Sequence, residues 1–250
     1  MQRPYRYLLE NAGNAIRLIE ACVRHGVTRF VLSSTANLFG AAKIIPIPED
    51  APIDPGSPYG ESKWMIERAL RWADEIHGLR SACLRYFNAA GADPAGRVGE
   101  DHDPETHLIP LIIDAALGRR PPLQVFGNDY PTPDGTCIRD YIHVSDLAEA
   151  HVRVLDLLDQ RSVTYNLGNG QGYSVLEVIR TVEAVTGRPA PFSVGPRRAG
   201  DPAVLVASSE AIRRDTGWQP RFPGLDDIVR TAYEWRNAHP GGYAATPSDR

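Results

Sequence analysis

The sequence predicts an α/β protein built on a parallel sheet with helices on both faces. Helical and strand patterns alternate over the first part of the chain: a helical pattern at 5–25, an apolar run at 29–33, a helix through 59–76 and a strand at 81–86. Such alternation is typical of parallel strands joined by right-handed helical crossovers. The apolar runs are short and continuous, as expected for strands that are buried on both faces.

The second part of the chain has a less regular pattern, rich in glycine, proline and aspartate. Its predicted helices and strands lie near 107–118, 123–126, 145–158, 163–166, 174–186, 208–216 and 225–237. We therefore divide the chain into three parts. A sheet domain spans 1–87, a smaller mixed α/β substrate lobe with short returns to the sheet spans 88–239, and a disordered tail spans 240–250.

The composition argues against several classes of partner. The chain of 250 residues carries a net charge of −4 and has no basic block, which disfavours nucleic acid and anionic membranes as partners. No apolar run approaches the roughly 18 residues that a membrane span needs. The three cysteines, Cys22, Cys83 and Cys137, are far apart and odd in number, a pattern that suits a reducing compartment. We expect a cytoplasmic protein.

Tyr59 and Lys63 form the strongest candidate for catalysis in the sequence. Residues four apart lie on one face of a helix, and Pro58 places the pair at a helix start. A free tyrosine has a pKa of about 10, and a lysine cation within about 4–6 Å favours the phenolate and lowers that pKa. Thr35 ends an apolar strand and could supply a hydroxyl to the same site. A bare pair of this kind also occurs on solvated helix faces.

Several segments together resemble the extended short-chain dehydrogenase/reductase superfamily and, within it, the UDP-glucose 4-epimerases. The resemblance runs from about residue 4 to residue 237. The segments that carry it are FVLSST (30–35), SPYGESK (57–63), LRYFNAAGA (84–92), FGNDY (126–130), DGTCIRDYIHV (134–144) and RRAGD (197–201). The stretch over 126–144 is specific to the epimerases. The resemblance implies that the sheet domain is the C-terminal part of a Rossmann-type NAD-binding domain.

The resemblance also implies a mechanism and a cofactor. In this family a tightly held NAD+ takes a hydride from C4 of the sugar, and the hydride later returns to the opposite face. Tyr59 matches the base that removes the 4-hydroxyl proton, Lys63 the residue that lowers its pKa and binds the nicotinamide ribose, and Thr35 the proton relay. The implied cofactor-binding residues are Asn11, Ser33, Ser34, Tyr59, Lys63 and Tyr86.

A second set of matches implies a UDP-sugar substrate. Its members are Thr35, Asn88, Leu108, Phe126, Arg139, Arg198, Asp201 and Leu205. Arg139 and Arg198 match the clamp on the diphosphate, which suits the fixed forks of two guanidinium groups. Asp201 matches a carboxylate on the uridine ribose, and Leu205 falls at the position that gates the size of the sugar. Assembly as a homodimer is a further expectation.

One expected part of a dinucleotide site does not occur in the sequence. A Gly-rich turn between a strand and a helix should precede Asn11, and Gly168-Asn169-Gly170-Gln171-Gly172 lies too late to serve as that phosphate cradle. At roughly 30 residues for each βαβ unit, we expect on the order of 80 residues to be missing. We therefore expect an N-terminally truncated chain, for which an inactive nucleotide-sugar-binding remnant is one alternative.

The other alternative is a nucleotide-sugar 4,6-dehydratase. That reaction usually needs an Asp-Glu pair directly after the hydroxyl residue, whereas Ala36 and Asn37 follow Thr35 here. We expect no metal site, because the acidic and histidine residues within 101–107 lack a recognised ligand spacing and lie in a loop. His143 is expected to be a buried structural histidine.

Overall fold

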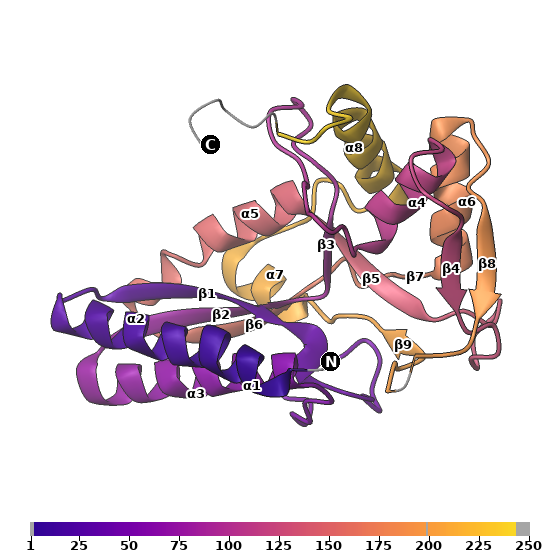
Figure 1. Cartoon of the computed structure of the whole chain (residues 1–250). Helices are drawn as coiled ribbons and strands as arrows, with labels where there is room; N and C mark the ends of the chain where they lie inside the picture. Colours follow the sequence, from indigo (N-terminus) through magenta and orange to yellow (C-terminus); the bar gives the residue numbers. More distant parts are fainter. Residues whose placement is uncertain (1–2, 199, 244–250) are drawn as a thin grey trace.

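The first half of the molecule is organised around a three-stranded parallel sheet. The computed structural model describes residues 3–198 and 200–243. In the order of the sheet, β1 (Arg29–Thr35) pairs with β2 (Arg80–Tyr86), and β2 pairs with β6 (Val163–Leu167) (Figure 1). Because the strands are parallel, their carboxyl ends meet at one edge of the sheet, where the segments that follow lie close together.

Helices from the N-terminal region cover one face of this sheet. The short helix α1 (Pro4–Tyr7), the π-helical segment η1 (Leu8–Gly13) and α2 (Asn14–Arg24) follow one another directly and pack beside α3 (Pro58–His77). The buried side chains of this layer are Ala12, Ile19, Leu32, Ile66, Leu70, Ala73, Leu79 and Cys83. This layer carries the helix that was predicted to hold the catalytic pair.

A second layer covers the opposite face of the sheet. It contains α5 (Val144–Arg153), the 3₁₀ turn η3 (Leu157–Asp159) and α7 (Glu210–Thr216). The buried side chains of this layer include Ala82, Leu84, Ala150, Val154, Leu158, Tyr165, Ile212 and Trp218. Side chains alternate between the faces along a strand, so β2 contributes to both layers and is buried on both sides, as its apolar run predicted.

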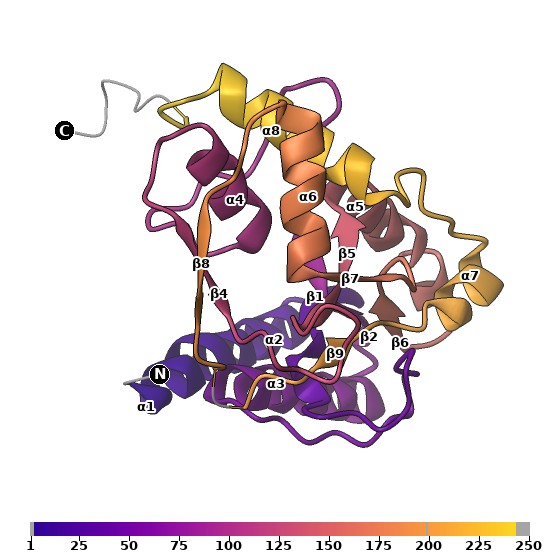
Figure 2. The ribbon, with the colours of Figure 1, turned by 90° about the vertical axis from the view of Figure 1, so that its right-hand side faces the viewer.

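The substrate lobe is built from shorter strands and three packed helices. Within the described residues its strands are β3 (Asn88–Ala90), β4 (Leu123–Phe126), β5 (Ile138–His143), β7 (Gly172–Ser174), β8 (Phe192–Gly195) and β9 (Val204–Leu205). β5 pairs with β3, β7 and β9, while β4 pairs with β8. The helices that share its core are α4 (Leu108–Ala116), α6 (Val175–Thr186) and α8 (Leu225–Ala238) (Figure 2).

A buried ion pair fixes α3 to the sheet. The guanidinium of Arg85 on β2 donates to both carboxylate oxygens of Glu67 on α3, with Nη2 2.6 Å from Oε2 and Nε 3.0 Å from Oε1. Both side chains are about nineteen-twentieths buried, at 6% and 5% exposure. Ser34 on β1 donates its hydroxyl proton to the same carboxylate at 2.5 Å. The carboxylate is therefore satisfied within the protein, which a buried charge requires.

The predicted fold class is confirmed, and most predicted elements lie within a few residues of those observed. The strands β3, β5, β7, β8 and β9 and the short 3₁₀ turn η2 (Ala36–Leu38) were not named from the sequence. Within the expected tail, the hydroxyl of Tyr243 donates to the carbonyl oxygen of Gly99 at 3.1 Å. The rest of that tail lies outside the described residues. Among the helices described, none is both long and apolar enough to cross a bilayer.

Candidate active site

The first turn of α3 brings Tyr59 to the carboxyl edge of the sheet. Ser57 caps the helix by accepting a hydrogen bond from the backbone N–H of Gly60 at 3.1 Å, and Pro58 occupies the first helical turn. A Cβ atom at Gly60 would collide with the backbone carbonyl oxygen of Asn37, which follows β1. Glycine therefore allows α3 to approach the end of β1 closely enough for Tyr59 to meet Thr35.

Tyr59 and Thr35 lie in a cleft between the sheet and the substrate lobe. The cleft has a volume of about 390 Å³, which falls within the usual range for small-molecule sites. Its lining residues are Thr35, Asn37, Tyr59, Tyr86, Phe87, Asn88, Ala89, Ala90, Glu100, His107, Leu108, Ile109, Pro110 and Tyr141. The structure thus brings together five residues that were predicted for the site from separate segments: Thr35, Tyr59, Tyr86, Asn88 and Leu108.

The pKa of Tyr59 is shifted in the direction opposite to the prediction. Burial of the phenol raises its pKa above the ordinary tyrosine value, and this outweighs a hydrogen bond with the Thr35 side chain that lowers it; the nearby Tyr86 raises it further. The Lys63 ammonium lies 5.8 Å from the centre of the Tyr59 ring and donates to the carbonyl oxygen of Ser33 at 3.0 Å. Burial also lowers the pKa of Lys63. Desolvation, rather than the lysine cation, therefore dominates this pair.

The remaining residues of the predicted cofactor set have defined partners. The amide of Asn11 donates to the hydroxyl of Ser62 on α3 at 3.1 Å, and the hydroxyl of Ser33 lies 3.1 Å from Nε2 of His151. Ser33 is exposed at the end of β1. Ser34 faces the other side of the strand, where its hydroxyl is bonded to Glu67. The Ser34 hydroxyl is therefore committed to Glu67 in this structure, and its contact with a cofactor stays a prediction.

Residues of the predicted substrate set are held by contacts within the lobe. The amide of Asn88 donates to the backbone carbonyl oxygen of Asp140 at 2.8 Å, which orients it at the cleft. Arg139 donates to a carboxylate oxygen of Asp201 at 2.5 Å, although the resemblance assigned the two residues to different parts of the nucleotide. Leu205 on β9 pairs with Arg139 on β5, so it lies beside this ion pair.

A second arginine of the set stacks on an aromatic ring. The guanidinium carbon of Arg198 lies 4.2 Å from the centre of the Phe126 ring. Such a stack leaves the donors of the guanidinium plane free to bind an anion. Arg198 is exposed and Phe126 is half-buried, so both are accessible to a ligand.

Three neighbours of the catalytic pair were missed from the sequence. The side-chain amide of Asn37 donates to the Thr35 hydroxyl at 3.3 Å, and the Tyr7 ring meets the Tyr59 ring edge to face with centres 6.3 Å apart. Tyr141 lines the cleft from β5. Asn37 could have been found from the sequence, because it lies two residues after Thr35 and residues that follow a parallel strand gather at the ligand-binding edge. Nothing in the local sequence indicates the other two.

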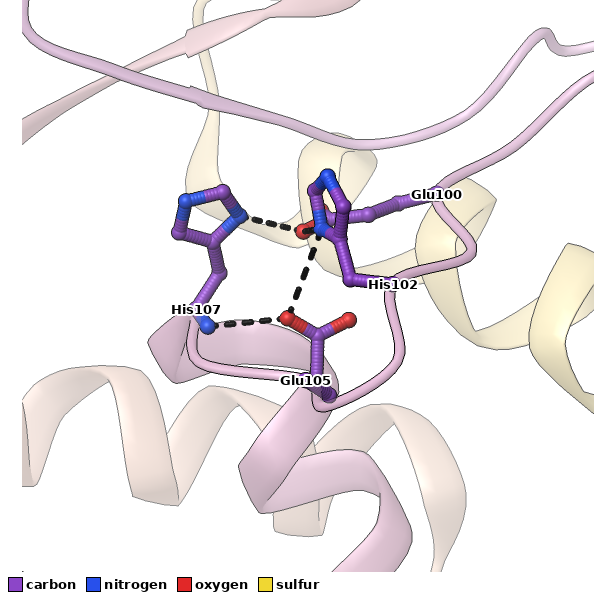
Figure 3. A group of neighbouring side chains, drawn as sticks. All are labelled: Glu100, His102, Glu105 and His107. Carbon is purple, nitrogen blue, oxygen red and sulfur yellow. Dashed lines mark hydrogen bonds and ion pairs between the residues drawn. The ribbon is translucent and has the colours of Figure 1, made fainter. Parts of the chain in front are cut away.

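The loop before α4 gathers four polar side chains at the margin of the cleft (Figure 3). They are Glu100, His102, Glu105 and His107, and their ligand-type atoms all lie within 4.8 Å of one another. Glu100 raises the pKa of His107 through a direct hydrogen bond to Nδ1. The sequence spacing matches no metal motif, and folding alone brings these residues together. His143 is fully buried, as predicted, and stacks on Phe222 with ring centres 4.3 Å apart.

The residues present fit one end of a nicotinamide dinucleotide. Lys63, Tyr59 and the exposed end of β1 at Ser33 offer an amine, a phenol and a hydroxyl at the edge where open α/β sheets bind nucleotides. The 250 residues contain no Gly-x-Gly-x-x-Gly, the sequence that would bring a helix N-terminus to the pyrophosphate. Lys63, Tyr59 and Ser33 are therefore the residues that could hold the nicotinamide ribose and its surroundings.

The fold is that of an α/β nucleotide-binding enzyme, and Tyr59 in the cleft is its candidate base. Residues 1–168 match the model of the NAD dependent epimerase/dehydratase family. A UDP-glucose 4-epimerase of Halalkalibacterium halodurans is 48% identical over 252 residues, which cover 100% of this chain and 75% of that protein. One from Azospirillum brasilense is 53% identical over 240 residues, covering 94% of this chain and 68% of that protein. The chain belongs to the NAD dependent epimerase/dehydratase family.

A solved structure shares the whole arrangement. UDP-glucose 4-epimerase from Bifidobacterium longum, determined in complex with NAD+ and UDP, superposes with a TM-score of 0.92 at 38% sequence identity. The similarity covers 97% of this chain and 73% of that one. Both halves of the molecule, the sheet and the substrate lobe, are therefore placed as in a family member that was solved with both ligands.

Proposed function

We propose that this protein interconverts UDP-glucose and UDP-galactose by inverting the sugar at C4, with NAD as its cofactor. The observation that carries the proposal is the cleft in which Tyr59 and Thr35 from the sheet half meet Asn88 and Leu108 from the lobe. Relatives named as UDP-glucose 4-epimerases cover the whole chain at close to 50% identity. When bound, NAD supplies a hydride acceptor and donor for C4.

The chain's own residues handle the proton. Tyr59, as phenolate, removes the proton of the 4-hydroxyl, and Thr35 hydrogen-bonds the phenol and lowers its pKa. Because burial keeps that pKa high, the phenolate is the minor form at neutral pH and the rate rises as the pH increases. Lys63, held on the Ser33 carbonyl beside the Tyr59 ring, is positioned to bind the nicotinamide ribose.

The lobe binds the nucleotide. Arg139 and Arg198 present guanidinium groups to the diphosphate, and each is already oriented, one by Asp201 and the other by the Phe126 ring. Asn88 holds its amide at the cleft through Asp140 and offers its remaining groups to the UDP portion. The arginines carry the affinity for a dianionic diphosphate.

We also propose a homodimer in the cytoplasm. Apolar side chains on neighbouring helices α2 and α3 are exposed, among them Ile16, Met65, Trp72 and Ile76, and such residues are typical of protein interfaces. All three cysteines are free thiols, which fits a reducing compartment. Light scattering of the purified protein should give twice the mass of the chain, and a monomer would contradict this part of the proposal.

Incubation of the purified intact chain with NAD and UDP-galactose tests the activity. Chromatography should show UDP-glucose, and the Tyr59→Phe variant should produce none above background. Protection by a UDP-sugar against thermal unfolding, without turnover or any effect of NAD, would instead support the binding remnant. Release of a 4-keto-6-deoxy sugar would support the dehydratase, for which the exposed Asn37 after Thr35 offers no carboxylate.

A further inference from the structure

The loop before α4 contains a set of side chains that the proposed reaction does not use. Glu100, His102, Glu105 and His107 converge from one short segment, and their ligand-type atoms all lie within 4.8 Å of one another (Figure 3). Nδ1 of His102 is 3.0 Å from Oε1 of Glu100 and 3.7 Å from Oε1 of Glu105. Nδ1 of His107 contacts the same oxygen of Glu100.

The separations of His102 from the two carboxylates, 3.0 and 3.7 Å, lie on either side of the spacing in a small tetrahedral site, and His107 and Glu100, now in direct contact, would part to admit the ion. Zinc–ligand bonds of about 2.0–2.1 Å place neighbouring ligand atoms roughly 3.3 Å apart. Two imidazole nitrogens and two carboxylate oxygens form a borderline donor set, which favours zinc and other late first-row ions over magnesium or calcium. The histidines contribute no compensating charge when neutral, so the two carboxylates leave the centre of the cluster electronegative.

The carboxylate of Glu105 is held in place by the backbone of its own loop. The backbone N–H groups of Thr106 and His107 donate to Oε1 of Glu105 at 2.7 and 2.9 Å. The other oxygen of Glu105 is buried and accepts no hydrogen bond from the described part of the chain, and the Glu105 side chain is only 8% exposed. Its nearest cation, Arg236, lies 3.7 Å away and is committed to Asp114 at 2.6 Å. Oε2 thus faces Arg236, and Oε1 is the oxygen that Glu105 turns toward His102 and the centre of the cluster (Figure 3).

We propose that Glu100, His102, Glu105 and His107 bind one divalent transition-metal ion, for which Zn²⁺ is the probe. The two histidines are about half exposed, so the ion can enter from solvent. Glu100 and His107 also line the catalytic cleft, so a bound ion clamps the loop at the margin of the substrate site. This role goes beyond the proposed reaction and requires no turnover to be observed.

Calorimetric titration of the intact, chelator-treated protein with Zn²⁺, without a histidine tag, tests the proposal. The wild type should bind one ion per chain, and both Glu100→Gln and His102→Asn should weaken binding at least tenfold. Removal of second-sphere partners alone typically costs 10–100-fold, so the loss of a ligand should cost no less. His25→Asn, an exposed histidine at the end of α2, is the matched control and should bind as the wild type does.

A thermal-unfolding series separates binding at this cluster from damage to the fold. Zn²⁺ should raise the unfolding midpoint of the wild type and of His25→Asn, because a ligand that binds only the folded state stabilises it, while His102→Asn should show no such rise. His102 is exposed, so its substitution leaves the fold intact. Absence of stoichiometric Zn²⁺ binding, unchanged affinity in both loop variants, or Mg²⁺ binding as tight as Zn²⁺ would each overturn the proposal.

Discussion

The sheet half and the substrate lobe hold their ionic groups in different ways. In the sheet half, Arg85 and Glu67 are almost fully buried, and the Arg85 guanidinium donates hydrogen bonds to both carboxylate oxygens of Glu67. In the lobe, Arg139 and Asp201 also pair closely, yet they remain 13% and 26% exposed at the predicted nucleotide site. A buried pair holds the fold together, whereas an accessible pair can exchange its partner for a ligand.

The two halves also divide the chemistry. Tyr59, Thr35 and Lys63 lie at the edge of a sheet whose long strands pair without interruption over seven residues of β1 and β2. Of the residues proposed to bind the nucleotide, Phe126, Arg139 and Leu205 lie on lobe strands that are two to six residues long, and Arg198 and Asp201 lie in a loop. Proton transfer requires reacting atoms to be held within a few tenths of an ångström, and the rigid sheet supplies that support. The comparison predicts that variants in the two halves fail in different ways.

Tyr59→Phe should have the largest effect on turnover. The substitution removes the proton-accepting oxygen and leaves the ring, so kcat should fall by about 10³-fold or more, within the range for a general base. The free energy of unfolding should change little. Steady-state kinetics and urea denaturation measure the two quantities, with the exposed Tyr5→Phe as control. Retention of wild-type turnover would remove Tyr59 from the mechanism.

Glu67→Gln should destabilise the fold without changing the site chemistry directly. An unpaired Arg85 would remain buried, and breaking a buried pair of this kind costs about 3–5 kcal/mol of unfolding free energy. Urea denaturation gives the value. Glu75→Gln breaks the exposed pair with Arg71 and should cost less than about 1 kcal/mol. Equal losses in the two variants would mean that burial does not distinguish these pairs.

Arg139→Ala should affect ligand binding more than stability. Loss of a charged hydrogen bond to the diphosphate costs about 1.5–3 kcal/mol, which is at least tenfold in the dissociation constant for UDP. Isothermal titration with UDP measures the effect. The UDP affinity of Arg139→Lys should lie between those of Arg139→Ala and the wild type, because lysine keeps the charge but lacks the paired donors of the guanidinium group. If UDP affinity is unchanged while the protein unfolds more easily, the pair with Asp201 is structural.

Thr35→Val should shift the dependence of activity on pH. The hydrogen bond from Thr35 lowers the pKa of Tyr59. Loss of this bond raises that pKa, so a smaller fraction of Tyr59 is phenolate at any pH below the pKa. The rising limb of kcat/KM should therefore move to higher pH, with a loss of about tenfold near neutrality. Thr35→Ser keeps a hydroxyl and should restore the wild-type profile. A valine variant with lower activity but an unmoved profile would limit Thr35 to substrate positioning.

The sequence predicted the sheet half better than the lobe. β1 and β2 each contain three consecutive apolar residues and β6 alternates apolar and polar residues, and each strand was placed to within two residues of its observed bounds. β5 carries Arg139, Asp140 and His143 between apolar residues, and its partners β3, β7 and β9 are distant in the chain. The polar residues of β5 interrupt the apolar pattern that would predict a strand. The long-range contacts that these residues make become visible only after folding.

The candidate site shows the same limit. Spacing along α3 and at the end of β1 correctly brought Tyr59 and Thr35 to one cleft. The direction of the Tyr59 pKa was wrong, because the sequence gives the distance to a lysine but not the degree of burial. The resemblance placed Ser34 in the cofactor set, and alternation along β1 turns its side chain toward Glu67. The acidic and histidine residues within 101–107 were set aside as a metal site for want of a recognised spacing, and the contribution of Glu100 was not foreseen because these contacts depend on the path of the loop.

The fate of the hydrogen at C4 tests the central claim most directly. The intact protein is incubated with NAD and UDP-glucose that carries deuterium at C4, and the UDP-galactose formed is examined by nuclear magnetic resonance. If Tyr59 exchanges only the proton on the 4-hydroxyl, the product keeps its deuterium at C4. A product that has lost this label to water, or the absence of any UDP-galactose, would contradict the account.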